Sequence, residues 1–211
     1  EKIKYNGFES SFKLYKDNNF IDNISLNMPG KHNVLNALGA ISIALELNID
    51  IQLIKKGLKN YSGVRRRFEL KYQTSKGVTI IDDYAHHPAE VKATIDAARL
   101  GWNNRIISIF QPHLFTRTRD FYKDFAKSFA KSDIVIITDI YPAREKPIEG
   151  ITGQLISKEL LKSGHKNVQY VGDPLSLPIF IKKMKLKDDI ILVMGAGNIW
   201  RICDNIYDEI K

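Results

Sequence analysis

The segment IDDYAHHPAE, residues 81–90, places two acids, a tyrosine and two adjacent histidines directly after a run of β-branched residues. Imidazoles exchange protons near neutral pH, and polar groups gathered at a strand end can bind charged ligands. Asp83, Tyr84 and His86 are therefore candidates for substrate binding or proton transfer. The simpler alternative is that Asp82 or Asp83 caps the helix that follows.

The segment HLFTRTRD, residues 113–120, joins His113 to two arginines at a predicted helix start. The planar guanidinium of Arg117, with that of Arg119 nearby, can clamp a carboxylate or a phosphate. The positive end of a helix attracts the same anions. The alternative is an ordinary helix start, capped by threonine, with both arginines in solvent.

Histidines concentrate in the polar segments, so a zinc site made by His86, His87 and His113 is a second alternative. Adjacent histidines point in different directions, and no cysteine lies nearby in the sequence. Zinc sites usually need a better arranged set of nitrogen and sulfur ligands. The sequence therefore favours a site in which these residues hold no metal.

The segment GKHNVLNALGA, residues 30–40, puts Asn33 and Asn36 three residues apart on one face of a predicted helix. Asparagine is a poor residue for a helix interior, and its amide can pair with the donor and acceptor at the edge of adenine. The two side chains are candidates for binding a nucleotide base, although Asn33 could instead cap the helix.

Two common phosphate-binding motifs do not fit this sequence. The turn VMGAGNIW has only Gly195 and Gly197, and too few residues follow it for the acidic ribose ligand of a dinucleotide site. Close packing of a strand-to-helix turn explains these glycines better. The motif G-x-x-x-x-G-K-[ST] does not occur, so the main phosphate loop of a nucleotide enzyme would have to lie outside these residues.

From residue 67 onward, predicted strands alternate with predicted helices. Strands are expected at 68–73, 77–82, 105–110, 133–140, 168–171 and 189–195, and helices at 88–100, 118–131, 152–163, 174–184 and 198–210. This alternation, with nearly continuous apolar runs in the central strands, predicts an α/β fold with a doubly wound, mostly parallel sheet. Ligands bind such sheets outside the carboxyl ends of the strands, where the polar segments fall.

The first 66 residues show a different pattern. Two strands and two helices are expected there, at 8–15, 20–28, 30–47 and 51–60. The segment GVRRRFE that follows is typical of a connector between domains, with a turn at Gly63. Because the chain begins at Glu1, part-way into an apparent hairpin, we expect it to be a piece of a longer protein.

The composition is that of a globular protein. Of 211 residues, 44% are hydrophobic and 27% charged, and no apolar run reaches the roughly 18 residues of a membrane span. A single cysteine, Cys203, and no visible export signal predict a cytoplasmic location. The formal net charge of +8 suits nucleic acid, an acidic membrane surface or anionic nucleotides as ligands.

Together these segments resemble the Mur ligases, over nearly the whole chain and in the right order. The most specific are DDYAHHP and FQPHLFTRT. The resemblance implies three domains: one for a UDP sugar, a central one for ATP, and a Rossmann-like C-terminal one. Residues 1–66 would be the end of the central domain and residues 67–211 the C-terminal domain. The phosphate loop and the magnesium ligands would precede them.

Within the family, the resemblance is to the members that use ATP to join L-alanine to UDP-N-acetylmuramate, a step in peptidoglycan precursor synthesis. The muramyl carboxylate would attack the γ-phosphate of ATP to give an acyl phosphate, and the amine of L-alanine would then displace phosphate. Such chemistry needs charge neutralisation, alignment and a neutral amine. ATP and Mg²⁺ are the implied cofactors. No metal ligand, nucleic-acid partner or membrane partner is implied for these residues.

On the nucleotide side, the residues take roles by this resemblance alone. Asn33 and Asn36 would lie near adenine. Arg67, the last arginine of the RRR run, would reach the ATP phosphates, and Asp83 would lie near the ribose.

On the substrate side, the resemblance places Tyr84, His86, His113 and Arg117 near the amino acid and the acyl phosphate, with His86 and Arg117 as catalytic residues. Many relatives carry an arginine where this chain has Leu114. One positive charge is therefore missing, and Arg117, with Arg119 as a second candidate, would supply more of the charge neutralisation.

Two other classes of function stay open from the residues. A nucleic-acid-binding module would use the basic charge, but the arginines cluster at strand ends and are not interleaved with aromatic residues. A regulatory domain that kept the fold and lost the activity would not need Asn33, Asn36, Arg67 and Asp83 together. The sequence favours the ligase over both.

Overall fold

The computed structural model describes residues 2–211. The chain divides into two compact units: unit 1 is formed by Glu1–Val64 with Asp96–Asn103, and unit 2 by Arg65–Ile95 with Asn104–Lys211. Within the described residues, no helix combines the length and the apolar character that crossing a membrane requires.

Unit 1 is a three-stranded antiparallel sheet with two helices, and its order is β1-β2-β3. The elements are β1 (Lys4–Asn6), β2 (Glu9–Lys16), β3 (Asn19–Leu26), α1 (Lys31–Glu46) and α2 (Ile51–Asn60). Asp17 and Asn18 join β2 to β3 with φ of 50° and 65°, as a two-residue hairpin turn requires. The two predicted strands and both helices are confirmed, whereas β1 was not predicted because it has only three residues.

Unit 2 is built on a six-stranded sheet with the order β4-β5-β9-β6-β7-β8. The strands are β4 (Glu69–Gln73), β5 (Thr79–Asp83), β6 (Ile106–Phe110), β7 (Ile134–Thr138), β8 (Val168–Gly172) and β9 (Ile190–Met194). Only β4, at one edge, pairs antiparallel; every other pairing is parallel. All residues of β5, β6 and β9 are buried, which confirms the predicted doubly wound, mostly parallel sheet.

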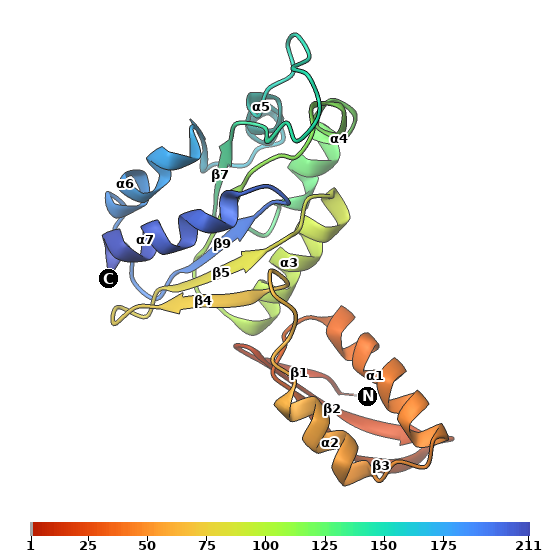
Figure 1. Ribbon diagram of the computed structural model, residues 1–211. Helices are drawn as coiled ribbons and strands as arrows, with labels where there is room; N and C mark the ends of the chain where they lie inside the picture. The colour runs from red at the N-terminus through yellow and green to blue at the C-terminus, as the bar shows by residue number, and fades with distance from the viewer. Residues whose placement is uncertain (1) are drawn as a thin grey trace. The chain divides into compact units, whose positions relative to one another are not determined.

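Helices cover both faces of this sheet (Figure 1). They are α3 (Pro88–Gly101), α4 (Phe115–Ser128), α5 (Gln154–Lys162), α6 (Leu177–Lys182) and α7 (Ile202–Ile210), with 3-10 turns at Pro174–Ser176 and Ile199–Arg201. Ile107 and Ile109 of β6 pack in one core cluster with residues of α6 and α7. Phe110 points to the other face, where its ring lies 5.0 Å from that of Phe125 in α4.

Helix α4 begins at Phe115, three residues before the predicted start, and no threonine caps it. The N-cap is Leu114, whose carbonyl accepts hydrogen bonds from Thr118 N at 3.1 Å and Thr118 Oγ1 at 2.9 Å. Thr118 therefore lies inside the first turn. The alternative of a cap by threonine is wrong, because the chain enters the helix through an unusual backbone conformation at Leu114.

Candidate functional site

The loops after β5 and β6, with the first turn of α4, bring Tyr84, His86, His113 and Arg117 together at the carboxyl edge of the unit 2 sheet. The ring centroids of Tyr84 and His86 lie 5.1 Å apart, and those of His86 and His113 lie 6.0 Å apart. Arg117 continues the group, with its Nη1 3.4 Å from His113 Nδ1. Four residues from two separate segments thus form one cluster of proton-exchanging and anion-binding groups, which we call the histidine cluster.

The tautomer of His86 is set by its neighbours. Its Nδ1 lies 2.9 Å from the carbonyl oxygen of Tyr84 and 3.2 Å from Glu90 Oε2. Because both neighbours are acceptors, Nδ1 carries the proton, and Nε2 is left to accept one. Glu90 Oε2 also accepts from the backbone N–H of His86 at 3.0 Å and of His87 at 3.1 Å, which fixes the entry to α3 as a capping carboxylate does.

His113 has the opposite tautomer. Its Nδ1 faces the Arg117 guanidinium, which can only donate, so Nδ1 is the acceptor and Nε2 carries the proton. Its ring stacks on Tyr141, with centroids 5.7 Å apart. Burial lowers the pKa of His113 below its ordinary value, and the charges of Arg117 and His86 lower it further. His113 is therefore a neutral donor beside a permanent cation.

Leu114 joins these two residues in a strained conformation. Its φ is 72°, a value that branched side chains rarely adopt, and such strain costs on the order of 1–3 kcal/mol. The loop after β7 holds it in place, because its N–H donates to the Tyr141 carbonyl at 3.0 Å. This position, where the family resemblance leads one to expect arginine, thus starts α4 and directs His113 and Arg117 to one side.

A carboxylate of the same chain lies at the start of α4. Glu145 accepts hydrogen bonds from Thr116 N at 3.0 Å and Thr116 Oγ1 at 2.5 Å. These bonds hold the pKa of Glu145 below its ordinary value. The predicted attraction of this helix start for anions is thus satisfied within unit 2. Sequence reasoning missed Glu145, which is 29 residues from its partner.

Arg67 stands on a turn whose flanking residues both have left-handed backbone, with φ of 58° at Arg66 and 51° at Phe68. The side chain of Arg67 is 51% exposed, so it can meet a ligand. Asp83 is buried, and its carboxylate accepts from Phe68 N at 2.8 Å and Ala85 N at 2.7 Å. We call residues Arg66–Phe68 the arginine turn. The alternative that Asp83 caps α3 is wrong, because its carboxylate binds the backbone of this turn and of the loop after β5.

Arg66 and Asp82 form a buried pair that sequence reasoning missed. Arg66 Nε lies 3.1 Å from Asp82 Oδ2, and the exposed fractions of their side chains are 19% and 1%. Burial raises the pKa of Asp82 to about 6, although the charge of Arg66 opposes this rise. The sequence shows the run of arginines and the two adjacent acids, but nothing in it indicates that Arg66 pairs with Asp82.

Asn33 and Asn36 lie on α1 of unit 1. The alternative that Asn33 caps the helix is wrong: the N-cap is Gly30, with φ of 95°, and no side chain caps it. Asn33 is half-buried and donates its Nδ2 to the Pro29 carbonyl at 2.8 Å, so its amide is partly committed to the preceding turn. Asn36 is exposed.

The glycines after β9 are explained by packing, as predicted. A Cβ at Gly197 would lie 2.6 Å from the Tyr141 ring and 2.7 Å from Gln111 Oε1. A Cβ at Gly195, whose φ is 151°, would lie 2.9 Å from the Gln111 carbonyl oxygen. Only glycine lets the chain pass this close to the loops after β6 and β7.

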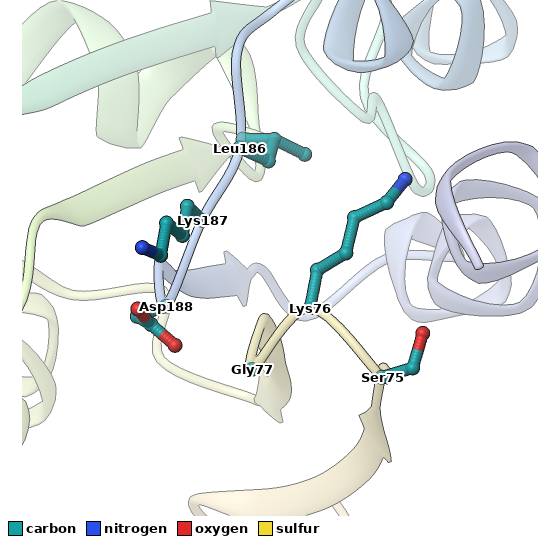
Figure 2. A pocket seen from close by; sticks show the side chains of 6 residues that line it. All are labelled: Ser75, Lys76, Gly77, Leu186, Lys187 and Asp188. Atoms are coloured by element: carbon teal, nitrogen blue, oxygen red, sulfur yellow. The ribbon is translucent and has the colours of Figure 1, made fainter.

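Two other features of unit 2 stand apart from the histidine cluster. The ring of His87 packs against Phe121, with the two centroids 5.2 Å apart. Within residues 2–211, no three His, Cys, Asp or Glu side chains are arranged to hold a metal ion. An open hollow of about 520 Å³ lies at the opposite end of the sheet, before β5 and β9. Figure 2 shows its lining, which is formed by Ser75, Lys76, Gly77, Leu186, Lys187 and Asp188. None of these is a predicted site residue.

Known proteins resemble this chain along its whole length. It is 40% identical over 209 residues to UDP-N-acetylmuramate–L-alanine ligase of Geotalea uraniireducens, covering 99% of this chain and 45% of that protein. It is 46% identical over 186 residues to the ligase of the same name from Pelodictyon phaeoclathratiforme, covering 87% and 39%. The chain therefore spans less than half the length of these curated relatives.

Solved structures of Mur ligases are also similar to this chain. The crystal structure of UDP-N-acetylmuramate–alanine ligase from Thermotoga maritima superposes with a TM-score of 0.82 at 27% identity, covering 99% of this chain and 44% of that one. The MurF ligase of Thermotoga maritima, solved with ADP, shares the fold, with a TM-score of 0.71 at 16% identity, covering 100% and 46%. The family model "Mur ligase, glutamate ligase domain" matches residues 66–197. This chain belongs to the Mur ligase family.

Proposed function

We propose that this chain is part of an ATP-dependent ligase that joins L-alanine to UDP-N-acetylmuramate through an acyl phosphate, in the synthesis of peptidoglycan precursors in the cytoplasm. The observation that carries the proposal is the histidine cluster, formed by the segments that are most specific for this type of Mur ligase. The names of relatives 40% identical along the whole chain support the same substrates.

In this proposal, the histidine cluster receives the amino acid. Arg117 binds a carboxylate or the developing charge of the acyl phosphate, since a guanidinium fork matches both. His86 accepts the proton of the attacking amine at Nε2, because its Nδ1 is already committed to the Tyr84 carbonyl and Glu90. His113 donates from Nε2 to a substrate oxygen, and its neutral ring adds no charge.

For the nucleotide, the proposal assigns residues within each unit separately. The exposed side chain of Arg67 suits the phosphates of ATP, and Asn36 with Asn33 suits the adenine edge. Asp83 is assigned near the ribose, although its buried carboxylate makes it equally a support of the arginine turn. Mg²⁺ would neutralise phosphate charge and would take its ligands from the rest of the longer protein. Residues 1–66 would end the ATP-binding domain, and 67–211 would form the C-terminal domain.

The test is phosphate release by the full-length protein. Release should require ATP, UDP-N-acetylmuramate and L-alanine together, and omission of any one should abolish it. A gel shift with nucleic acid at near-physiological salt tests the rival class. Tight nucleic-acid binding without substrate-dependent phosphate release would overturn the proposal.

A further inference from the structure

We infer that Arg66 and Asp82 form a positioning pair that holds the turn carrying Arg67 against the ends of two central strands. The inference rests on the proposed function, in which Arg67 binds the phosphates of ATP. The sequence indicated Asp82 only as a helix cap and gave no separate role to Arg66.

The guanidinium of Arg66 is committed to protein groups. Nε binds Asp82 Oδ2 at 3.1 Å, Nη1 donates to the Gly197 carbonyl at 3.3 Å, and Nη2 donates to the Gly195 carbonyl at 2.5 Å. The guanidinium carbon also lies 4.9 Å from the centre of the Tyr84 ring. Each nitrogen already has an acceptor, so Arg66 is poorly placed to bind a phosphate itself.

These contacts join the turn to β5 and β9, the two strands whose ends they reach. The backbone of the turn is tied as well. Arg66 O accepts from Tyr84 N at 2.7 Å, Arg66 N donates to Glu69 Oε2 at 2.7 Å, and Phe68 N donates to Asp83 Oδ2 at 2.8 Å. Arg67 therefore stands between two anchored residues, and its own side chain is the exposed one.

The left-handed conformations of Arg66 and Phe68 are costly for residues with side chains, and they persist only where the surroundings enforce them. The Arg66 guanidinium is the contact that reaches furthest, to residues 129 and 131 positions away. Without it, the turn can relax toward ordinary backbone and move Arg67. A displacement of about 1 Å in such a group can cost roughly 10²-fold in rate.

The charge of Asp82 completes the pair. Its Oδ2 faces Arg66, and its Oδ1 is buried with no hydrogen-bond partner among residues 2–211. The other ionisable groups acting on this carboxylate are Glu69 of β4 and Asp83 of β5, and the carboxylate in turn acts on the Cys203 thiol of α7. Arg66 is therefore the cation that favours the ionised form of Asp82 at neutral pH.

The experiment is a double-mutant cycle in the full-length ligase. Arg66→Gln should lower kcat/KM for ATP by roughly 10- to 100-fold, and Arg66→Lys, which keeps the charge without the fork, should lose less. Arg65, which is exposed, provides the matched control. The kcat/KM of Arg65→Gln should stay within about twofold of that of the unmodified protein. The double variant Arg66→Gln/Arg67→Ala should be no worse than Arg67→Ala, since Arg66 acts through Arg67.

Two outcomes of the double-mutant cycle would overturn the inference. One is a near-normal kcat/KM for Arg66→Gln with a lowered Tm, and the other is a double variant whose loss is the product of the single losses.

If Arg66→Gln does not fold, Asp82→Asn provides the test. In the unmodified protein kcat/KM for ATP should fall as the pH drops through about 6, and Asp82→Asn should lose that part of the profile. Histidines titrate in this range too, so only the difference between the two proteins counts; identical profiles would also overturn the inference. Failure of the proposed function would appear separately, as an unmodified protein without substrate-dependent phosphate release.

Discussion

Arg117 Nη1 lies 3.4 Å from His113 Nδ1, four residues earlier in the chain and across the start of α4. The contact joins a group that is always charged to an imidazole whose protonation it opposes. Together with burial, it lowers the pKa of His113. The histidine cluster therefore presents one cation and one neutral donor, an arrangement that suits an anionic oxygen without requiring a second charge.

Replacing Arg117 tests the substrate side of the cluster. In the full-length ligase we expect Arg117→Ala to lower kcat/KM for L-alanine by roughly 10²-fold or more, about 2.7 kcal/mol of transition-state stabilisation. ATP binding should change little, because Asn33, Asn36 and Arg67 remain. Arg117→Lys should recover only part, since lysine lacks the planar fork.

The matched control for that experiment lies two residues away. Arg119 is exposed and pairs with Asp120 at 2.8 Å, so Arg119→Ala should keep near-normal kinetics. If Arg117→Ala also kept its kcat/KM and changed only the Tm, Arg117 would belong to the scaffold.

The titration of His113 gives a second prediction. The folded protein binds a proton at His113 less tightly than the unfolded chain does, so this site makes the free energy of unfolding fall as the pH drops below about 6.5. His113→Gln should remove that part of the pH dependence in denaturant titrations. By NMR, Arg117→Ala should raise the pKa of His113 and Arg119→Ala should not. An unchanged titration in Arg117→Ala would show that the contact is not made in solution.

Two glycine-to-alanine substitutions with opposite expected effects on the free energy of unfolding test the packing after β9. Gly197→Ala should lower the free energy of unfolding of unit 2 by about 1–3 kcal/mol, because its Cβ would overlap the Tyr141 ring and Gln111. Gly57→Ala, in α2, meets nothing within 4 Å and should stabilise unit 1 by about 0.5–1 kcal/mol. Thermal denaturation followed by circular dichroism measures both, and a Gly197→Ala protein of unchanged Tm would contradict the packing account.

The 211-residue chain by itself should have no ligase activity. Its sequence holds no G-x-x-x-x-G-K-[ST] loop, so the residues that would cradle the phosphates of ATP have to come from elsewhere. The purified chain should release no phosphate with ATP, UDP-N-acetylmuramate and L-alanine present, whereas the full-length protein should. Substrate-dependent release by the chain alone would require a phosphate site within these residues.

The fold could be predicted from the sequence because its signals are local. Apolar runs such as Ile106–Phe110 and Ile190–Met194 identify strands covered on both faces, and the rule for parallel sheets then places the polar loops at one edge. The sheet rule placed the segments that hold Tyr84, His86 and Arg117 at this edge, and the family resemblance assigned the three residues to the substrate side.

What could not be predicted depends on contacts between distant residues. The start of α4 was misplaced because Leu114 adopts a positive φ that the loop after β7 enforces, and leucine gives no hint of it. The partners of Arg66 are 16, 129 and 131 residues away, and Thr116 is 29 residues from Glu145. No periodicity records such pairings, so these supports of the site were missed, although the polar groups that directly follow the strands were found.

The anchoring of the arginine turn limits where this chain can be recombined with other Mur ligases. A chimaera joined between Val64 and Arg65 inherits the turn and its receptors from one parent. A junction between Arg66 and Arg67 would take the guanidinium from one parent, but Asp82 and the carbonyls of Gly195 and Gly197 from the other. A chimaera joined before Arg65 should therefore be active, whereas one joined two residues later, after Arg66, should lose activity.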